Sequence, residues 1–177
     1  MKKLILIVFS ILSISLWAQT PKIVVAAAKG NMKKVANCIK KGNIDAKSRT
    51  KWSALAYAVN RNDLPMTQLL LENNADINTK INTQETPLLI ATKYNYTDIA
   101  ALLINYKADV MAIDIIRFTP LHWAAKNGNK KLIILLLESG ADINAQNVSG
   151  RTVLDLASAS VKKYLISKGA KYSKELL

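Results

Sequence analysis

The chain contains one histidine, His122, and one cysteine, Cys38, the side-chain types that most often act as bases, nucleophiles and metal ligands. A single cysteine can form neither an intrachain disulfide nor a cysteine-based zinc site. A histidine acting as a base needs a nucleophile and an orienting partner, and the sequence indicates neither for His122. These counts argue against a metal cluster and a Cys–His nucleophile.

Three aspartates, Asp76, Asp109 and Asp142, recur at intervals of 33 residues. A calcium ladder is one interpretation, but residues one repeat apart in a stacked helical protein lie roughly 10 Å from each other. Calcium requires ligands about 2.3–2.6 Å from one ion, so a turn or capping role is favoured. No phosphate-binding loop, nucleophile elbow or zinc-protease motif occurs. We therefore expect no enzymatic activity, cofactor, metal site or small-molecule substrate.

The interval of 33 residues extends through most of the chain. Residues 119–125 align with residues 53–59, 86–92 and 152–158, each beginning with Ser or Thr and carrying Leu two positions later. Residues 135–144 align in the same way with residues 69–78. Such self-similarity is typical of repeat architectures, in which each unit buries its apolar face against its neighbours.

The period and the segment Thr-Pro-Leu-His-Trp-Ala at residues 119–124 resemble the ankyrin repeat. The resemblance implies an all-α repeat solenoid of stacked helix-turn-helix units joined by β-hairpin-like turns. We expect a repeat domain over residues 19–177. Its five units are an N-terminal cap (20–49), three full repeats (50–82, 83–115 and 116–148) and a C-terminal cap (149–177).

The two end units are irregular. The first fits the pattern if one residue is deleted after Gly42, and the last lacks four residues near positions 158–160. In a full unit, Thr119 is predicted to cap a short helix that ends at Gly128. A second helix follows from about Lys130. The resemblance assigns His122 a bracing role, and Cys38 aligns with a buried leucine and is expected in the core.

The first residues resemble a secretory signal peptide, residues 1–18. Lys2 and Lys3 precede an apolar run over residues 4–16, which is short for a membrane-spanning helix. Cleavage is expected after Ala18, with cleavage after Ser15 or an uncleaved N-terminal anchor as alternatives. This segment predicts export to a periplasm or secretion.

The resemblance also predicts a partner-binding concave surface formed by the turn tips and the first helices. An apolar tip occurs at residues 115–118, where a solvated turn is normally polar. The alternative is that these side chains fold back and are buried. The turn glycine remains only at Gly150 and is replaced by Lys51, Gln84 and Arg117. The candidate partner-binding residues are Arg49, Trp52, Arg61, Lys93, Tyr94, Ile115, Ile116, Phe118, Lys126 and Arg151.

Half of the residues are apolar and 21% are charged, which is a globular rather than a disordered balance. The net charge of +13 favours acidic partners. We therefore predict a non-catalytic module that binds an unidentified protein, with docking to anionic lipid or another polyanion through the lysine-rich ends as the alternative. Arginine is scarce, which argues against nucleic acid.

Overall fold

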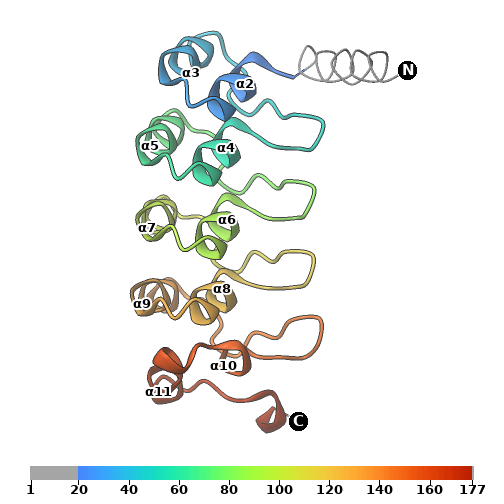
Figure 1. Ribbon diagram of the computed structural model, residues 1–177, viewed down its shortest axis with the longest axis vertical. Helices are drawn as coiled ribbons and strands as arrows, with labels where there is room; N and C mark the ends of the chain where they lie inside the picture. The colour runs from blue at the N-terminus through green and yellow to red at the C-terminus, as the bar shows by residue number, and fades with distance from the viewer. Residues whose placement is uncertain (1–19, 177) are drawn as a thin grey trace, which may run out of the picture.

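In the part of the chain that the computed structural model describes, residues 20–176, five helix pairs stack in a column (Figure 1). The first, inner helix of each pair is α2 (Lys22–Ala28), α4 (Ala54–Asn60), α6 (Pro87–Lys93), α8 (Pro120–Lys126) or α10 (Val153–Leu156). The second, outer helix is α3 (Met32–Ile39), α5 (Leu64–Glu72), α7 (Thr97–Asn105), α9 (Lys130–Glu138) or α11 (Ala159–Ser167). A 3₁₀ turn, η1 (Ser173–Glu175), follows α11. The expected all-α repeat solenoid is confirmed.

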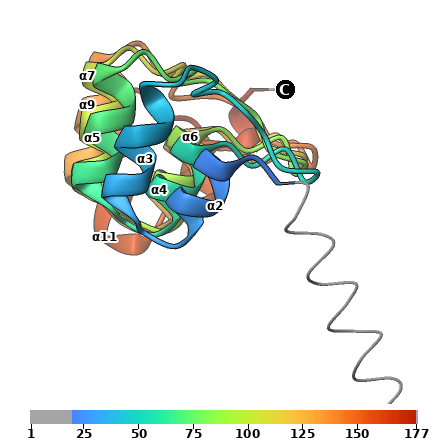
Figure 2. The same cartoon turned by 90° about the horizontal axis from the view of Figure 1, so that it is seen from above.

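Four long turns project from the same side of the column and superimpose when it is viewed along its length (Figures 1 and 2). The β pairing recorded in residues 20–176 consists of two isolated bridges, Lys47 with Ser53 and Gln146 with Thr152. We call these turns the four hairpins, numbered by the inner helix that each precedes: the α4, α6, α8 and α10 hairpins. All four place a residue with positive φ at the tip: Lys51 (60°), Gln84 (61°), Arg117 (58°) and Gly150 (71°).

The inner helices α4, α6, α8 and α10 each begin after a capping Ser or Thr, as the sequence predicts. The Thr119 hydroxyl accepts a hydrogen bond from the backbone N–H of His122 at 3.4 Å, and Ser53 and Thr86 cap α4 and α6 in the same way. These side chains satisfy backbone donors that the first helical turn leaves unpaired. Gly128 follows α8 with φ of 70°, a left-handed conformation that glycine adopts at low cost.

The core consists of alanines and larger aliphatic residues on the inner helices and mainly of aliphatic residues on the outer helices. Leu70, Leu103 and Leu136 occupy one position in three successive outer helices, and each is 0% exposed. Cys38 occupies the same position in α3 but is only partly buried, so the expectation of a core cysteine is wrong. The reason is that no helix pair precedes the first unit in residues 20–176 to cover this face.

The last unit differs where the sequence lacks four residues. Helix α10 has only four residues, and Ala157 follows it in an extended conformation. The backbone N–H of Ser158 then donates to the carbonyl of Ala125 at 2.9 Å, which joins this unit to α8. The Asp155 carboxylate accepts hydrogen bonds from the backbone N–H groups of Thr152 and Ser173, so the C-terminal segment is fastened to α10.

None of the helices between residues 20 and 176 has the length and apolarity needed to cross a bilayer. The expected signal peptide, residues 1–18, lies outside the described residues, as does its cleavage site.

Candidate functional site

The four hairpins project from the side of the column on which the inner helices lie (Figure 1), and we call the hairpins and inner helices on this side the hairpin face. The ten predicted partner-binding residues all lie on these elements, with different exposure. Seven of them are exposed: Arg49, Arg61, Tyr94, Ile115, Ile116, Lys126 and Arg151. Trp52 and Lys93 are partly buried, and Phe118 is buried.

The tip of the α8 hairpin presents apolar side chains to solvent. Ile115 is 64% exposed and Ile116 is 40% exposed, and Val148 on the α10 hairpin is 60% exposed. The backbone N–H of Val148 donates to the carbonyl of Ile116 at 3.2 Å, which holds the two tips side by side. These three side chains therefore form an ordered apolar patch, which we call the tip patch.

Asp114 sets the shape of the α8 hairpin from beneath. Its carboxylate is buried and accepts hydrogen bonds from the backbone N–H groups of Ile116 (3.0 Å) and Phe118 (2.9 Å). The indole N–H of Trp123 donates to the second carboxylate oxygen at 3.3 Å. One side chain thus links the exposed tip to helix α8.

Phe118 is only 6% exposed, so its side chain folds back as in the alternative interpretation, and its contact with a partner stays a prediction. The ring packs on Trp123 and on His122, with centroid distances of 4.9 and 5.2 Å. Phe118 immediately precedes the capping Thr119, and an apolar residue there commonly packs on the fourth residue of the helix, a hydrophobic staple. Trp52 packs on Tyr57 in the same way, at 4.8 Å.

Next to the tip patch, two lysines flank an indole ring. The ammonium group of Lys93 lies 5.5 Å from the centroid of the Trp123 ring, and that of Lys126 lies 5.0 Å from it. Lys93 also donates to Glu85 at 2.7 Å, and this hydrogen bond raises the pKa of Lys93 despite the opposing effect of burial. Trp123 is not among the residues predicted from sequence, although it stands five residues after Phe118, the spacing of a hydrophobic staple.

The Arg61 side chain makes a hydrogen bond within the protein, between the first two units. Its guanidinium donates to the backbone carbonyl of Ala28 at 3.2 Å, across the boundary between the first two units. Asn127 makes the equivalent contact with the carbonyl of Thr92 at 2.9 Å. Arg61 therefore fastens α4 to α2, and its role in partner binding stays a prediction.

His122 braces the start of α8. It is 0% exposed, and its Nδ1 accepts a hydrogen bond from the backbone N–H of Thr119 at 3.1 Å. Burial lowers the pKa of His122, because a charged ring is poorly solvated there, although the backbone carbonyls of Arg151 and Ala145 oppose this effect. The side chain is therefore a neutral structural group at pH 7.

We expect acid to destabilise the protein through His122. Its folded pKa lies below the ordinary value of about 6.5, so below that pH the unfolded chain binds the proton more readily. Stability should fall as the pH drops from 6.5 towards the folded pKa, by at most about 1.4 kcal/mol per pH unit for one proton. Urea unfolding between pH 7.5 and pH 5 measures this slope. His122→Gln, which does not titrate, should flatten it, and an unchanged slope in that variant would contradict the assignment.

The three recurring aspartates act within their own turns rather than together. Each carboxylate accepts a hydrogen bond from the backbone N–H two residues later: Asp76 from Asn78 (3.1 Å), Asp109 from Met111 (2.9 Å) and Asp142 from Asn144 (2.9 Å). Within residues 20–176, no group of three His, Cys, Asp or Glu side chains could hold a metal ion. The predicted turn role of these aspartates agrees with these contacts.

Comparison with known protein families agrees with the repeated helix pairs. A family model described as ankyrin repeats, in three copies, matches residues 23–114, and a model of a single ankyrin repeat matches residues 117–148. No curated protein matches the chain. The matched residues include the Thr119 cap, the His122 brace and the α4 and α6 hairpins. The chain belongs to the ankyrin-repeat family.

Proposed function

We propose that this ankyrin-repeat protein is a non-catalytic scaffold that is exported from the cytoplasm and holds a protein partner against its hairpin face. Ankyrin repeats mediate protein–protein interactions in general. The observation that carries the proposal here is the tip patch, in which Ile115, Ile116 and Val148 are exposed although they lie on an ordered surface. A contiguous exposed apolar patch is typical of an interaction site.

The surroundings of the tip patch favour an amphipathic partner. Lys93 and Lys126 lie against Trp123, and the exposed Tyr94 lies beside Lys93. Aromatic and cationic side chains are common among the residues that contribute most to binding. An apolar partner segment flanked by carboxylates would place its side chains on the tip patch and its charges near the two lysines.

The proposal predicts a selective loss of binding when the tip patch becomes polar. The double variant Ile115→Ser/Ile116→Ser should weaken capture of a partner from extracytoplasmic extracts at least tenfold. The reason is that the partner would bury both isoleucine side chains in the wild-type complex, and the variant lacks this apolar contact. Ile166→Ser on α11 is the matched control, since Ile166 is also 52% exposed but lies on an outer helix. Equal capture by the double variant and the control would contradict the proposal.

The second candidate function is docking to a polyanionic surface, and the contact between the last two units provides the observation that favours it. The ammonium groups of Lys130 and Lys168 lie 4.9 and 5.7 Å from the ring centroid of Tyr164, so positive charge gathers there. This binding would weaken steeply with salt, since exposed charges are screened beyond about 10 Å at 0.1 M. Partner capture that survives high salt favours the protein scaffold, and its loss favours electrostatic docking.

A further inference from the structure

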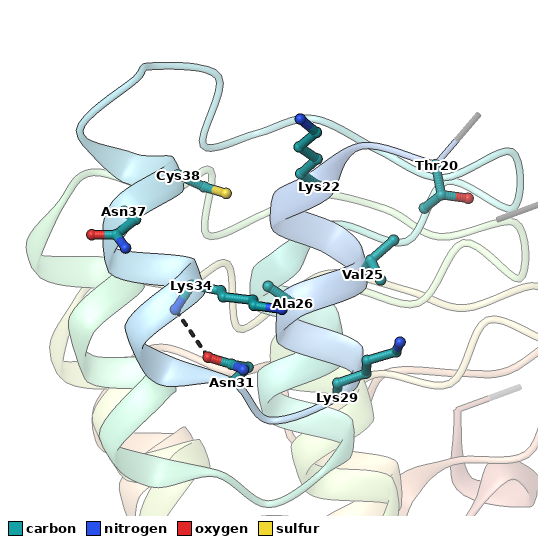
Figure 3. A pocket seen from close by; sticks show the side chains of 9 residues that line it. All are labelled: Thr20, Lys22, Val25, Ala26, Lys29, Asn31, Lys34, Asn37 and Cys38. Carbon is teal, nitrogen blue, oxygen red and sulfur yellow. Dashed lines mark hydrogen bonds between the residues drawn. The ribbon is translucent and has the colours of Figure 1, made fainter. Parts of the chain in front are cut away.

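The open end of the first unit contains a groove of about 510 Å³ between α2 and α3. Val25, Ala26 and Cys38 supply its apolar surface, and Figure 3 shows the Cys38 thiol directed from α3 towards α2. The lining includes Lys22, Lys29 and Lys34 but no acidic residue. We call this the end groove, and it lies at one end of the column, away from the tip patch on the α8 and α10 hairpins (Figure 1).

Substitutions in the repeat pattern create the end groove. Lys34 stands where the full repeats have Met66, Ile99 and Leu132, which are all almost completely buried. Cys38 stands where they have leucine, which has a larger side chain. Figure 3 shows Lys34 extending from α3 across the groove towards Ala26 on α2. The first unit therefore replaces the apolar surface that would receive another repeat with a hollow that a lysine crosses.

The charge around the end groove is strongly positive. Residues 20–49 contain eight lysines and arginines but only one acidic residue, Asp45. The Asp45 carboxylate accepts a hydrogen bond from the backbone N–H of Asp76 in the next unit, and it does not line the groove. A second hollow of about 170 Å³ adjoins the first, shares Lys22 and Cys38 with it, and adds Lys41. An anionic group in the end groove would meet lysines and no carboxylate among the lining residues.

We propose that the end groove binds a single-chain alkyl anion, such as a medium-chain fatty carboxylate. The alkyl chain would lie on Val25, Ala26 and Cys38, and the anionic head would pair with Lys34 and Lys29. The groove volume is within the 300–1,000 Å³ that is usual for small-molecule sites. A helix about 10–12 Å across would not fit inside it, and a second copy docking through its own lysine-rich last unit would be repelled.

The single thiol provides a direct test in the full chain. Laurate, below its micelle concentration, should slow maleimide labelling of Cys38 at least fivefold and in a saturable manner, because the alkyl chain would cover Sγ. Decanol carries an alkyl chain without a charge, acetate carries a charge without a long chain, and dodecyltrimethylammonium carries the opposite charge. We expect weak protection or none from these three compounds. Protection by decanol or dodecyltrimethylammonium as strong as that by laurate would overturn the proposal.

Two variants separate binding from folding. Lys34→Met introduces the residue that α5 carries at this position and removes one charge, so laurate affinity should fall at least tenfold. Lys168→Met in the last unit is the matched control and should bind laurate normally.

Cys38→Leu should fill the groove. Titration calorimetry with this variant should show no laurate binding, while its unfolding midpoint is retained. Undiminished laurate binding by folded Lys34→Met or Cys38→Leu would overturn the proposal. This site is independent of the hairpin face, so the failure of either proposal leaves the other intact.

Discussion

Replacing Leu103 by alanine is expected to lower the free energy of unfolding by about 2–5 kcal/mol. Leu103 is 0% exposed on α7, which packs between α5 and α9 in the middle of the column. The substitution removes apolar contacts and leaves a cavity that both neighbouring units border. Because each repeat depends on contacts with its neighbours, a defect in a central unit should weaken the whole array.

Cys38→Ala provides the matched control for this prediction. It shortens the side chain at the same repeat position, but Cys38 is only partly buried at the end of the column. Its cost should be below about 1 kcal/mol, because few contacts are lost. Urea unfolding followed by circular dichroism measures both variants. Equal losses for Leu103→Ala and Cys38→Ala would contradict the stacked core described above.

The second large effect is expected at Asp114. Asp114→Ala removes the acceptor for three N–H groups, those of Ile116, Phe118 and the Trp123 indole. Hydrogen bonds to a charged acceptor are stronger than average, and unsatisfied buried donors are costly, so the loss should be about 2–4 kcal/mol. The effect should concentrate in the α8 hairpin, where Ile115 and Ile116 would lose their fixed positions.

Amide hydrogen exchange distinguishes this local effect from general destabilisation. In Asp114→Ala the amides of Ile116 and Phe118 should exchange faster, whereas those of the distant helix α5 should change much less. Asp114→Asn keeps one acceptor oxygen and should retain roughly half of the lost stability. Unchanged exchange at Ile116 in the alanine variant would show that Asp114 does not hold the hairpin.

The repeat period predicts most of the fold, because each unit carries its own local signals. A Ser or Thr caps each of α4, α6, α8 and α10, and Gly128 follows α8 in the left-handed conformation. Asp63 caps the outer helix α5. Asp63, for example, accepts a hydrogen bond from the backbone N–H of Met66 at 3.0 Å. Such capping contacts involve residues three positions apart, so sequence spacing alone is enough to foresee them.

The candidate site is less predictable, because the solvent exposure of a side chain depends on tertiary contacts that residue spacing in the sequence does not reveal. An aromatic residue at a turn tip can face solvent or fold back, and Phe118 folds back because Trp123 offers a ring five residues later. The prediction for Cys38 fails in the opposite direction, since the repeat pattern predicts a buried side chain and Cys38 is only partly buried. Its repeat position is fully buried only where a preceding unit covers it. Lys51, Gln84 and Arg117 retain the positive φ of the turn glycine, so the turn shape survives loss of the residue that normally signals it.

The Lys93–Trp123–Lys126 cluster also could not be assembled from sequence alone. Lys93 belongs to α6, whereas Trp123 and Lys126 belong to α8, and stacking of neighbouring units brings them together. A search for residues aligned one repeat apart pairs Lys93 with Lys126, but it does not reveal the indole between them. The register of one inner helix on the next supplies that information.

The most direct test of partner binding on the hairpin face is site-specific photocrosslinking in the native extract. A benzophenone amino acid would replace Ile115 or Val148 on the tip patch, and Gln68 on outer helix α5 as the exposed control. The account predicts the same discrete protein adduct from both tip positions, persistent at high salt and absent from the Gln68 variant. Adducts from Gln68 that match those from the tips, or a tip signal that disappears at high salt, would contradict it.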